Sequence, residues 1–182
     1  MKKILLSLLA VVFLVALIFG SQWLLSKGNN KEEEKEITTA SAEEIAEGKS
    51  PQSRRVPGAL PSLDINSSSS QDDVLSVMHM MTHQKIIANE KWGAILMTPE
   101  NIVTVHEIIE QSNYPNKNDL LKITKRWKTA DFGSVDHHHN SIWRLQGGTI
   151  GKALGIMTAE EERWFIIHNF GDEAAENWLD NQ

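Results

Sequence analysis

The chain has 182 residues, a net charge of −6 and no cysteine. The lack of cysteine excludes a disulfide framework, a thiolate zinc site, a cysteine nucleophile and a lipid-modified cysteine. The acidic balance disfavours binding to nucleic acid or anionic lipid, because both require a basic surface.

The first 26 residues have the composition of a membrane anchor. Lys2 and Lys3 precede an uncharged, mostly apolar run from Ile4 to Leu25. A helix of this length, at about 1.5 Å per residue, spans a hydrocarbon core of about 30 Å. We therefore expect residues 4–25 to contact the membrane, with the N-terminus cytoplasmic and the C-terminal domain outside. The alternative is a signal peptide cleaved after Gly28, which would also place the remainder of the chain outside the cell membrane.

Residues 27–70 are dominated by charges, three prolines and four consecutive serines. Such a composition predicts a disordered linker, since it buries too little apolar surface to offset chain entropy. One helical turn is expected within it, at "SAEEIAE". Residues 71–182 remain for one domain, which is enough for a small core of its own.

The domain shows helical patterns throughout. Apolar residues recur at helical spacing, and serine or threonine caps, a first-turn proline and terminal glycines mark helix ends. The predicted helical segments are 69–86, 97–113, 116–132, 134–148, 158–171 and 172–182, and the only strand candidate is "WGAILM". These patterns predict a small all-α domain of five or six helices with short loops.

Two motifs in the domain resemble catalytic signatures but are incomplete. "GGTIGKA" suggests a phosphate-binding loop, but Gln146 and Ala153 occupy positions where that motif requires glycine and serine or threonine. The pair His106 and Glu107 suggests a zinc peptidase, but Glu110 stands where the second histidine is required. Nucleotide binding is therefore rejected, and peptidase activity is disfavoured.

A histidine set is the main candidate for chemistry. His79 and His83 are four residues apart and share one helix face. A further helix contains His137, His138 and His139, one of which must face inward. His79, His83 and His139 together could bind zinc or copper, whose ligands are commonly imidazoles. The alternative is that these histidines only pack and form hydrogen bonds, because their spacing alone does not bring two helices together.

Several stretches of the domain resemble an uncharacterised family of membrane-anchored proteins of Bacillus-like bacteria. The stretches are "MHMMTHQK", "KWGAILMTPENI", "RWKTADF", "HNSIWRLQGGTIGKALGI" and "TAEEE". The resemblance covers roughly residues 71–170 and implies a location and a domain boundary, but no activity. It favours His79, His83, His139, Asn140, Trp143, Gln146 and Gly148 as positions to inspect, and it does not extend to His137 or His138.

The sequence thus predicts a membrane-anchored extracytoplasmic helical protein with a binding or regulatory role and an envelope protein as partner. Its candidate binding surface comprises Trp143, Gln146, Gly148 and Lys152. The alternative function is a metal-binding envelope protein, or a metal-dependent enzyme, that uses the histidine set. No nucleic-acid partner is expected, and zinc is the cofactor to consider.

Overall fold

The computed structural model describes residues 39–60 and 62–179. Residues 37–182 form one compact unit, which contains the two apolar clusters described below. The predicted membrane anchor lies outside the described residues. Within the described part of the chain, no helix combines the length and the apolar character that crossing a membrane demands.

The described part of the chain is mostly helical, and several of its helices begin where the sequence provides capping groups, although the two that begin at Lys117 and Val135 have no side-chain cap. Ser70, Thr98 and Thr158 each accept a hydrogen bond from a backbone N–H of the first helical turn, which satisfies a donor that would otherwise lack a partner. The six helices after residue 70 are α3 (Gln71–Thr82), α4 (Pro99–Gln111), α5 (Lys117–Lys128), α6 (Val135–Leu145), α7 (Ala159–Phe170) and α8 (Asp172–Leu179). The predicted number of helices is therefore confirmed.

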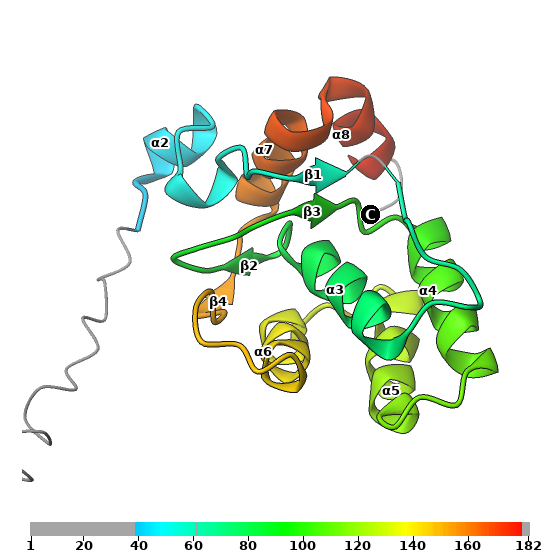
Figure 1. Ribbon diagram of the computed structural model, residues 1–182. Helices are drawn as coiled ribbons and strands as arrows, with labels where there is room; N and C mark the ends of the chain where they lie inside the picture. The colour runs from blue at the N-terminus through cyan, green and yellow to red at the C-terminus, as the bar shows by residue number, and fades with distance from the viewer. Residues whose placement is uncertain (1–38, 61, 180–182) are drawn as a thin grey trace, which may run out of the picture. The chain divides into compact units, whose positions relative to one another are not determined.

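Four short strands depart from the all-α prediction. β1 (Ala59–Leu60) pairs in parallel with β3 (Ala94–Ile95), which lies within the predicted strand candidate. β2 (Ile86–Ile87) pairs antiparallel with β4 (Gly155–Ile156). Two-residue strands leave almost no sequence pattern, because the alternation that marks a strand needs about four residues. In the view of Figure 1, α7 and α8 lie on one side of the β1–β3 pair, and α3 to α6 lie on the other.

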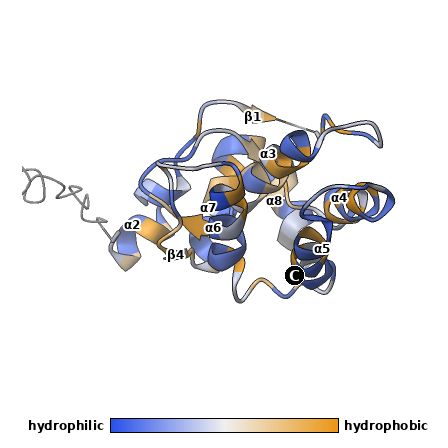
Figure 2. Ribbon diagram, turned by 60° about the horizontal axis from the view of Figure 1, so that its bottom comes forward, coloured by the Kyte–Doolittle hydropathy of each residue, from blue (hydrophilic) through white to orange (hydrophobic). Residues whose placement is uncertain are grey.

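The main core lies between α3, α4, α5 and α6. Its fully buried side chains are Leu75, Met78, Met81, Ile109, Leu120, Trp127 and Ile142. The two methionines are thus part of the core, as gap-filling residues often are. Helices α4 and α5 each have apolar and polar sides (Figure 2), and they pack against each other through the apolar ones. A second cluster of Val56, Ala94, Met157 and Phe165 connects the strands to α7.

The prediction of a disordered linker over residues 27–70 is wrong for the part that the structure describes, residues 39–60 and 62–70. That part contains α2 (Ala42–Ala46), at the predicted helical turn, a 3-10 helix η1 (Pro51–Ser53) and β1. Ser50 and Ser53 are buried and donate hydrogen bonds to the side chain and the backbone carbonyl of Glu161 in α7, at 2.7 and 3.0 Å. The segment is held by long-range polar contacts rather than by a core of its own, which composition cannot indicate.

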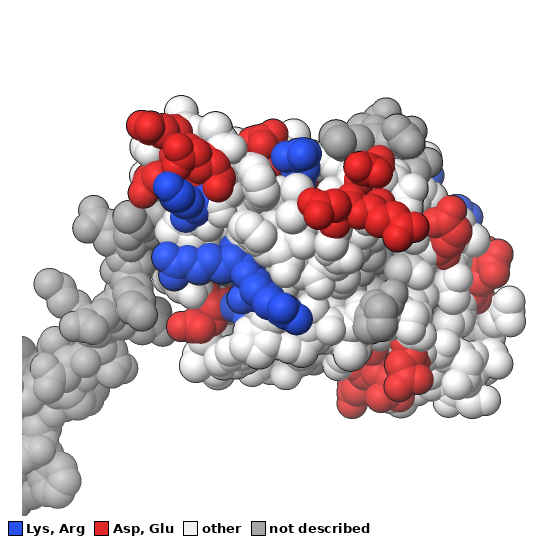
Figure 3. Space-filling model, turned by 90° about the horizontal axis from the view of Figure 1, so that it is seen from above, with Lys and Arg blue, Asp and Glu red and all other residues white. Residues whose placement is uncertain are grey.

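The charged surface is divided into separate areas. On the face shown in Figure 3, acidic side chains form several patches and basic side chains form a short stripe. The basic charge on this face is therefore local.

Candidate metal centre

The structure brings together the three histidines selected from the sequence. His79 lies in the last turn of α3, His83 caps the end of that helix, and His139 lies in α6, which packs on α3. Their ring centroids are 4.4 to 5.5 Å apart. His83 and His139 are buried, and His79 is half-buried. One potential ligand nitrogen from each ring lies within 4.8 Å of the others.

Two of these histidines are oriented by hydrogen bonds to oxygen acceptors. His79 Nδ1 donates to the side-chain oxygen of Gln146 at 2.5 Å, and His83 Nδ1 donates to the carbonyl of Gly93 at 2.7 Å. Each bond places the ring proton on Nδ1 and leaves a lone pair on Nε2. Metal-binding histidines are held by the same arrangement, in which the second nitrogen donates to a carbonyl, amide or carboxylate oxygen.

The third histidine has more hydrogen-bond contacts than available hydrogens. His139 Nδ1 lies 2.8 Å from Thr82 Oγ1, and His139 Nε2 lies 3.0 Å from the carbonyl of Gly151. Thr82 Oγ1 is also 2.6 Å from the carbonyl of His79. A neutral imidazole and a hydroxyl supply only two hydrogens for these three contacts. Both ring nitrogens of His139 therefore face polar atoms of the protein, Nδ1 facing Thr82 and Nε2 facing the Gly151 carbonyl, so that carbonyl has to move aside before Nε2 can bind an ion.

Burial keeps all three imidazoles neutral. It lowers the pKa of His139 to about 4, with a further contribution from the nearby His79. It also lowers the pKa of His83 well below the ordinary value, although the bond to Gly93 opposes the change. The pKa of His79 is lowered for the same reason, against the opposing effect of Gln146. Neutral imidazole is the form that binds metal, so no proton has to be displaced at neutral pH.

The donor set suits zinc or copper. Three imidazole nitrogens with no thiolate are typical of sites for these metals, and a water or substrate can take a fourth position. With metal–nitrogen bonds of about 2.0–2.1 Å, tetrahedral ligands stand about 3.4 Å apart. The separation of up to 4.8 Å therefore has to contract. His79 has the most freedom to rotate, because it is the least buried of the three.

The other predicted binding residues have different roles. Gln146 joins the histidine cluster and also donates to Ser76 Oγ at 3.3 Å. Trp143 is half-buried, and its Nε1 donates to the carbonyl of Ile150 at 2.8 Å. Gly148 lies directly under this indole, since a Cβ there would be 2.3 Å from Trp143 Nε1. Trp143 and Gly148 thus shape the turn after α6, whereas Lys152 is exposed in the loop that follows.

The remaining histidines of the earlier candidates do not join the centre. His137 is exposed. His138 is buried and accepts a hydrogen bond from Trp127 Nε1 at 3.1 Å. His106 is buried and bonded to Thr124 Oγ1 at 2.8 Å, so the incomplete peptidase motif belongs to the α4–α5 interface. Two histidines of the central triplet face inward, where one was expected.

Apart from Gln146, which the sequence had indicated, the groups that orient the centre were not predicted. The role of Thr82 could not be predicted, because in the sequence it is only one more residue of the helix, between His79 and His83. The carbonyls of Gly93 and Gly151 cannot be recognised from residue type at all, since every residue has one. Asn140 holds the loop that contains Gly151 in place by two hydrogen bonds to the backbone of Ala153, at 2.8 and 2.9 Å. The resemblance indicated this position without assigning it a role.

Comparison with known proteins adds a family without an assigned activity. Neither the comparison with curated proteins nor that with solved structures found a match. A family model matches residues 78–167, which include the whole histidine cluster and the loop that covers His139. The Bacillus-like source and the membrane anchor stay predictions. Residues 78–167 are identified as a domain of DUF6241, a family of unknown function.

Proposed function

We propose that this domain binds a zinc or copper ion through His79, His83 and His139. The observation that carries the proposal is the convergence of three neutral, buried or half-buried imidazoles from two helices, with ligand nitrogens within 4.8 Å of one another. Exposed histidine clusters can form by chance. This one is enclosed, oriented by Gln146 and Gly93, and short of one hydrogen at His139.

The test is metal binding by the untagged unit of residues 37–182. Elemental analysis and zinc titration are expected to give one ion per chain, with a rise in melting temperature that EDTA reverses. A ligand that binds only the folded state stabilises it. Replacing both His79 and His83 by alanine should abolish binding. The matched control is His137→Ala, which removes an exposed histidine two residues from His139 and should leave binding unchanged.

The contribution of Gln146 to metal affinity distinguishes a metal site with an oriented ligand from a chance cluster of histidines. Gln146→Leu removes the acceptor that orients His79 while keeping a side chain of similar length. Loss of such an orienting partner typically weakens metal binding about tenfold to a hundredfold. Equal zinc affinity in Gln146→Leu and the wild type would contradict this arrangement. Zinc binding that survives the double histidine substitution would contradict the site itself.

We further propose that the domain works outside the cell membrane, held there by residues 4–25. The support is the uncharged apolar run and the two preceding lysines. The expected result is that the full chain stays with membranes in alkaline carbonate. Protease added from outside should digest the domain. Release of an intact, shortened chain into the medium would instead indicate a cleaved signal peptide.

Partner binding is the second candidate function, and a specific observation favours it. Leu145, Ile150 and Leu154 expose 42%, 58% and 44% of their surface around the loop that covers His139. Clustered exposed apolar residues are common at protein interfaces. Envelope proteins captured by the wild type should be lost with Ile150→Ser and retained in EDTA. Capture that requires metal would make the loop part of a metal-dependent interaction.

A further inference from the structure

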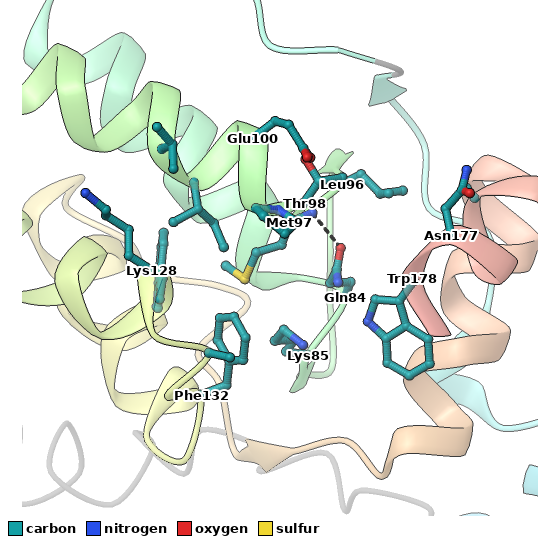
Figure 4. Close-up of a pocket in the computed structure, with 16 residues that line it drawn as sticks. Gln84, Lys85, Leu96, Met97, Thr98, Glu100, Lys128, Phe132, Asn177 and Trp178 are labelled. Carbon is teal, nitrogen blue, oxygen red and sulfur yellow. Dashed lines mark hydrogen bonds between the residues drawn. The ribbon is translucent and has the colours of Figure 1, made fainter. Parts of the chain in front are cut away.

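A pocket that is lined by none of the three histidines has features of a ligand site. It has a volume of about 660 Å³, within the range of about 300–1,000 Å³ that small-molecule sites occupy. It lies between α8 on one side and α4 and α5 on the other (Figure 4). Its apolar lining includes Leu96, Met97, Ile102, Trp127, Phe132 and Ala174.

One member of a buried ion pair, Lys85, lines the pocket. Lys85 Nζ lies 2.6 Å from Glu162 Oε1, and both side chains are less than 10% exposed. Gln84 donates to the same carboxylate oxygen at 2.8 Å. A buried pair of this kind contributes little to stability compared with apolar residues of equal size. Lys85 lines the pocket together with the apolar side chains and with polar residues such as Thr98 and Asn177, and its burial there favours a role in binding.

Two donors at the pocket are incompletely used. The Lys85 ammonium has three hydrogens: one faces Glu162, and the Phe132 ring lies 4.2 Å from Nζ, which leaves the third without an acceptor among the described residues. Trp178 also lines the pocket, and its buried Nε1 has no acceptor within the described part of the chain. Figure 4 shows the Lys85 side chain and the Trp178 ring facing one another across the lower part of the pocket.

We propose that this pocket binds a small, mostly apolar and uncharged molecule that carries a hydrogen-bond acceptor such as a ketone, ester or amide carbonyl. The apolar walls would take the body of the molecule, and Lys85 and Trp178 would donate to its carbonyl. A carboxylate fits less well, because Glu162 already balances the charge of Lys85 and the pocket also holds one further residue of each sign, Lys128 and Glu100, so a second anion would remain uncompensated. The pocket is separate from the histidine centre, and binding does not depend on metal.

The experiment uses prodan, a neutral naphthalene ketone, as the probe on residues 37–182 in EDTA. Bound prodan should show blue-shifted emission and energy transfer from tryptophan. The analogue with an alkyl group in place of the ketone should bind at least fivefold more weakly, and the naphthoate analogue more weakly still. Equal binding of the alkyl analogue would overturn the role of the acceptor, and stronger binding of the naphthoate would overturn the choice of an uncharged ligand.

Substitutions locate the binding. Ala174→Trp fills the pocket and should abolish the prodan signal, and unchanged binding would place the probe elsewhere. Trp178→Phe keeps an aromatic ring but removes the indole N–H, and it should weaken binding about fivefold to tenfold, as expected for one hydrogen bond. The matched control is Trp164→Phe, which removes another buried indole N–H without an acceptor, from a residue that does not line the pocket. An equal loss in both phenylalanine variants would overturn the assignment of Trp178.

Discussion

The low pKa of His139 makes the stability of the metal-free domain dependent on pH. The folded-state pKa is about 4, against a reference value of 6.5. As the pH falls below 6.5, the unfolded chain takes up a proton that the folded chain does not, so folding becomes less favourable. The loss is nearly complete once the pH reaches 4. A difference of 2.5 pKa units corresponds to about 3 kcal/mol of unfolding free energy.

The test compares the wild type with His139→Gln by urea unfolding in EDTA between pH 7 and pH 4. Glutamine can donate to the Gly151 carbonyl and accept from Thr82, but it does not titrate. The charge of His139 also lowers the pKa of His83, so the difference between the two curves reports position 139 together with this coupling. The stability of the wild type relative to the variant should fall by about 3 kcal/mol over this range. Parallel curves would refute the conclusion that His139 is kept neutral by burial.

Three further predictions concern packing and the buried ion pair. Gly148→Ala places a methyl group against the indole of Trp143 and should cost about 2–3 kcal/mol of stability. Gly147→Ala meets no atom within 4 Å but keeps φ at +69° and should cost only about 1 kcal/mol, as thermal or urea unfolding would show. Lys85→Met alone should destabilise by about 3–5 kcal/mol, because it leaves Glu162 charged and buried. Adding Glu162→Gln should recover much of that loss in the same assay. Ser53→Ala removes a buried hydrogen bond to α7 and should cost about 1 kcal/mol, whereas a disordered linker would show no change.

Much of the local structure could be predicted because its causes are local. The caps at Ser70, Thr98 and Thr158 act within one turn of the chain, and apolar spacing marks the face that each helix buries. His79 and His83 had to share a helix side for the same reason. The uncharged run from Ile4 to Leu25 is likewise visible in the sequence alone, although its relation to a membrane stays a prediction.

Tertiary packing decided the rest, because those features depend on groups far apart in the chain. Only the contact of α3 with α6 selects His139 for the centre and leaves His137 exposed. The contacts of Ser50 and Ser53 with Glu161 span more than a hundred residues. The composition around the two serines therefore predicts a linker, although the segment is folded. The pocket beside Lys85 and Trp178 also forms only when α8 lies opposite α4 and α5. A sequence pattern reflects interactions between residues that are close in the chain. The buried hydrogen-bond acceptors and the cavities that determine the chemistry form only when segments far apart in the chain pack together.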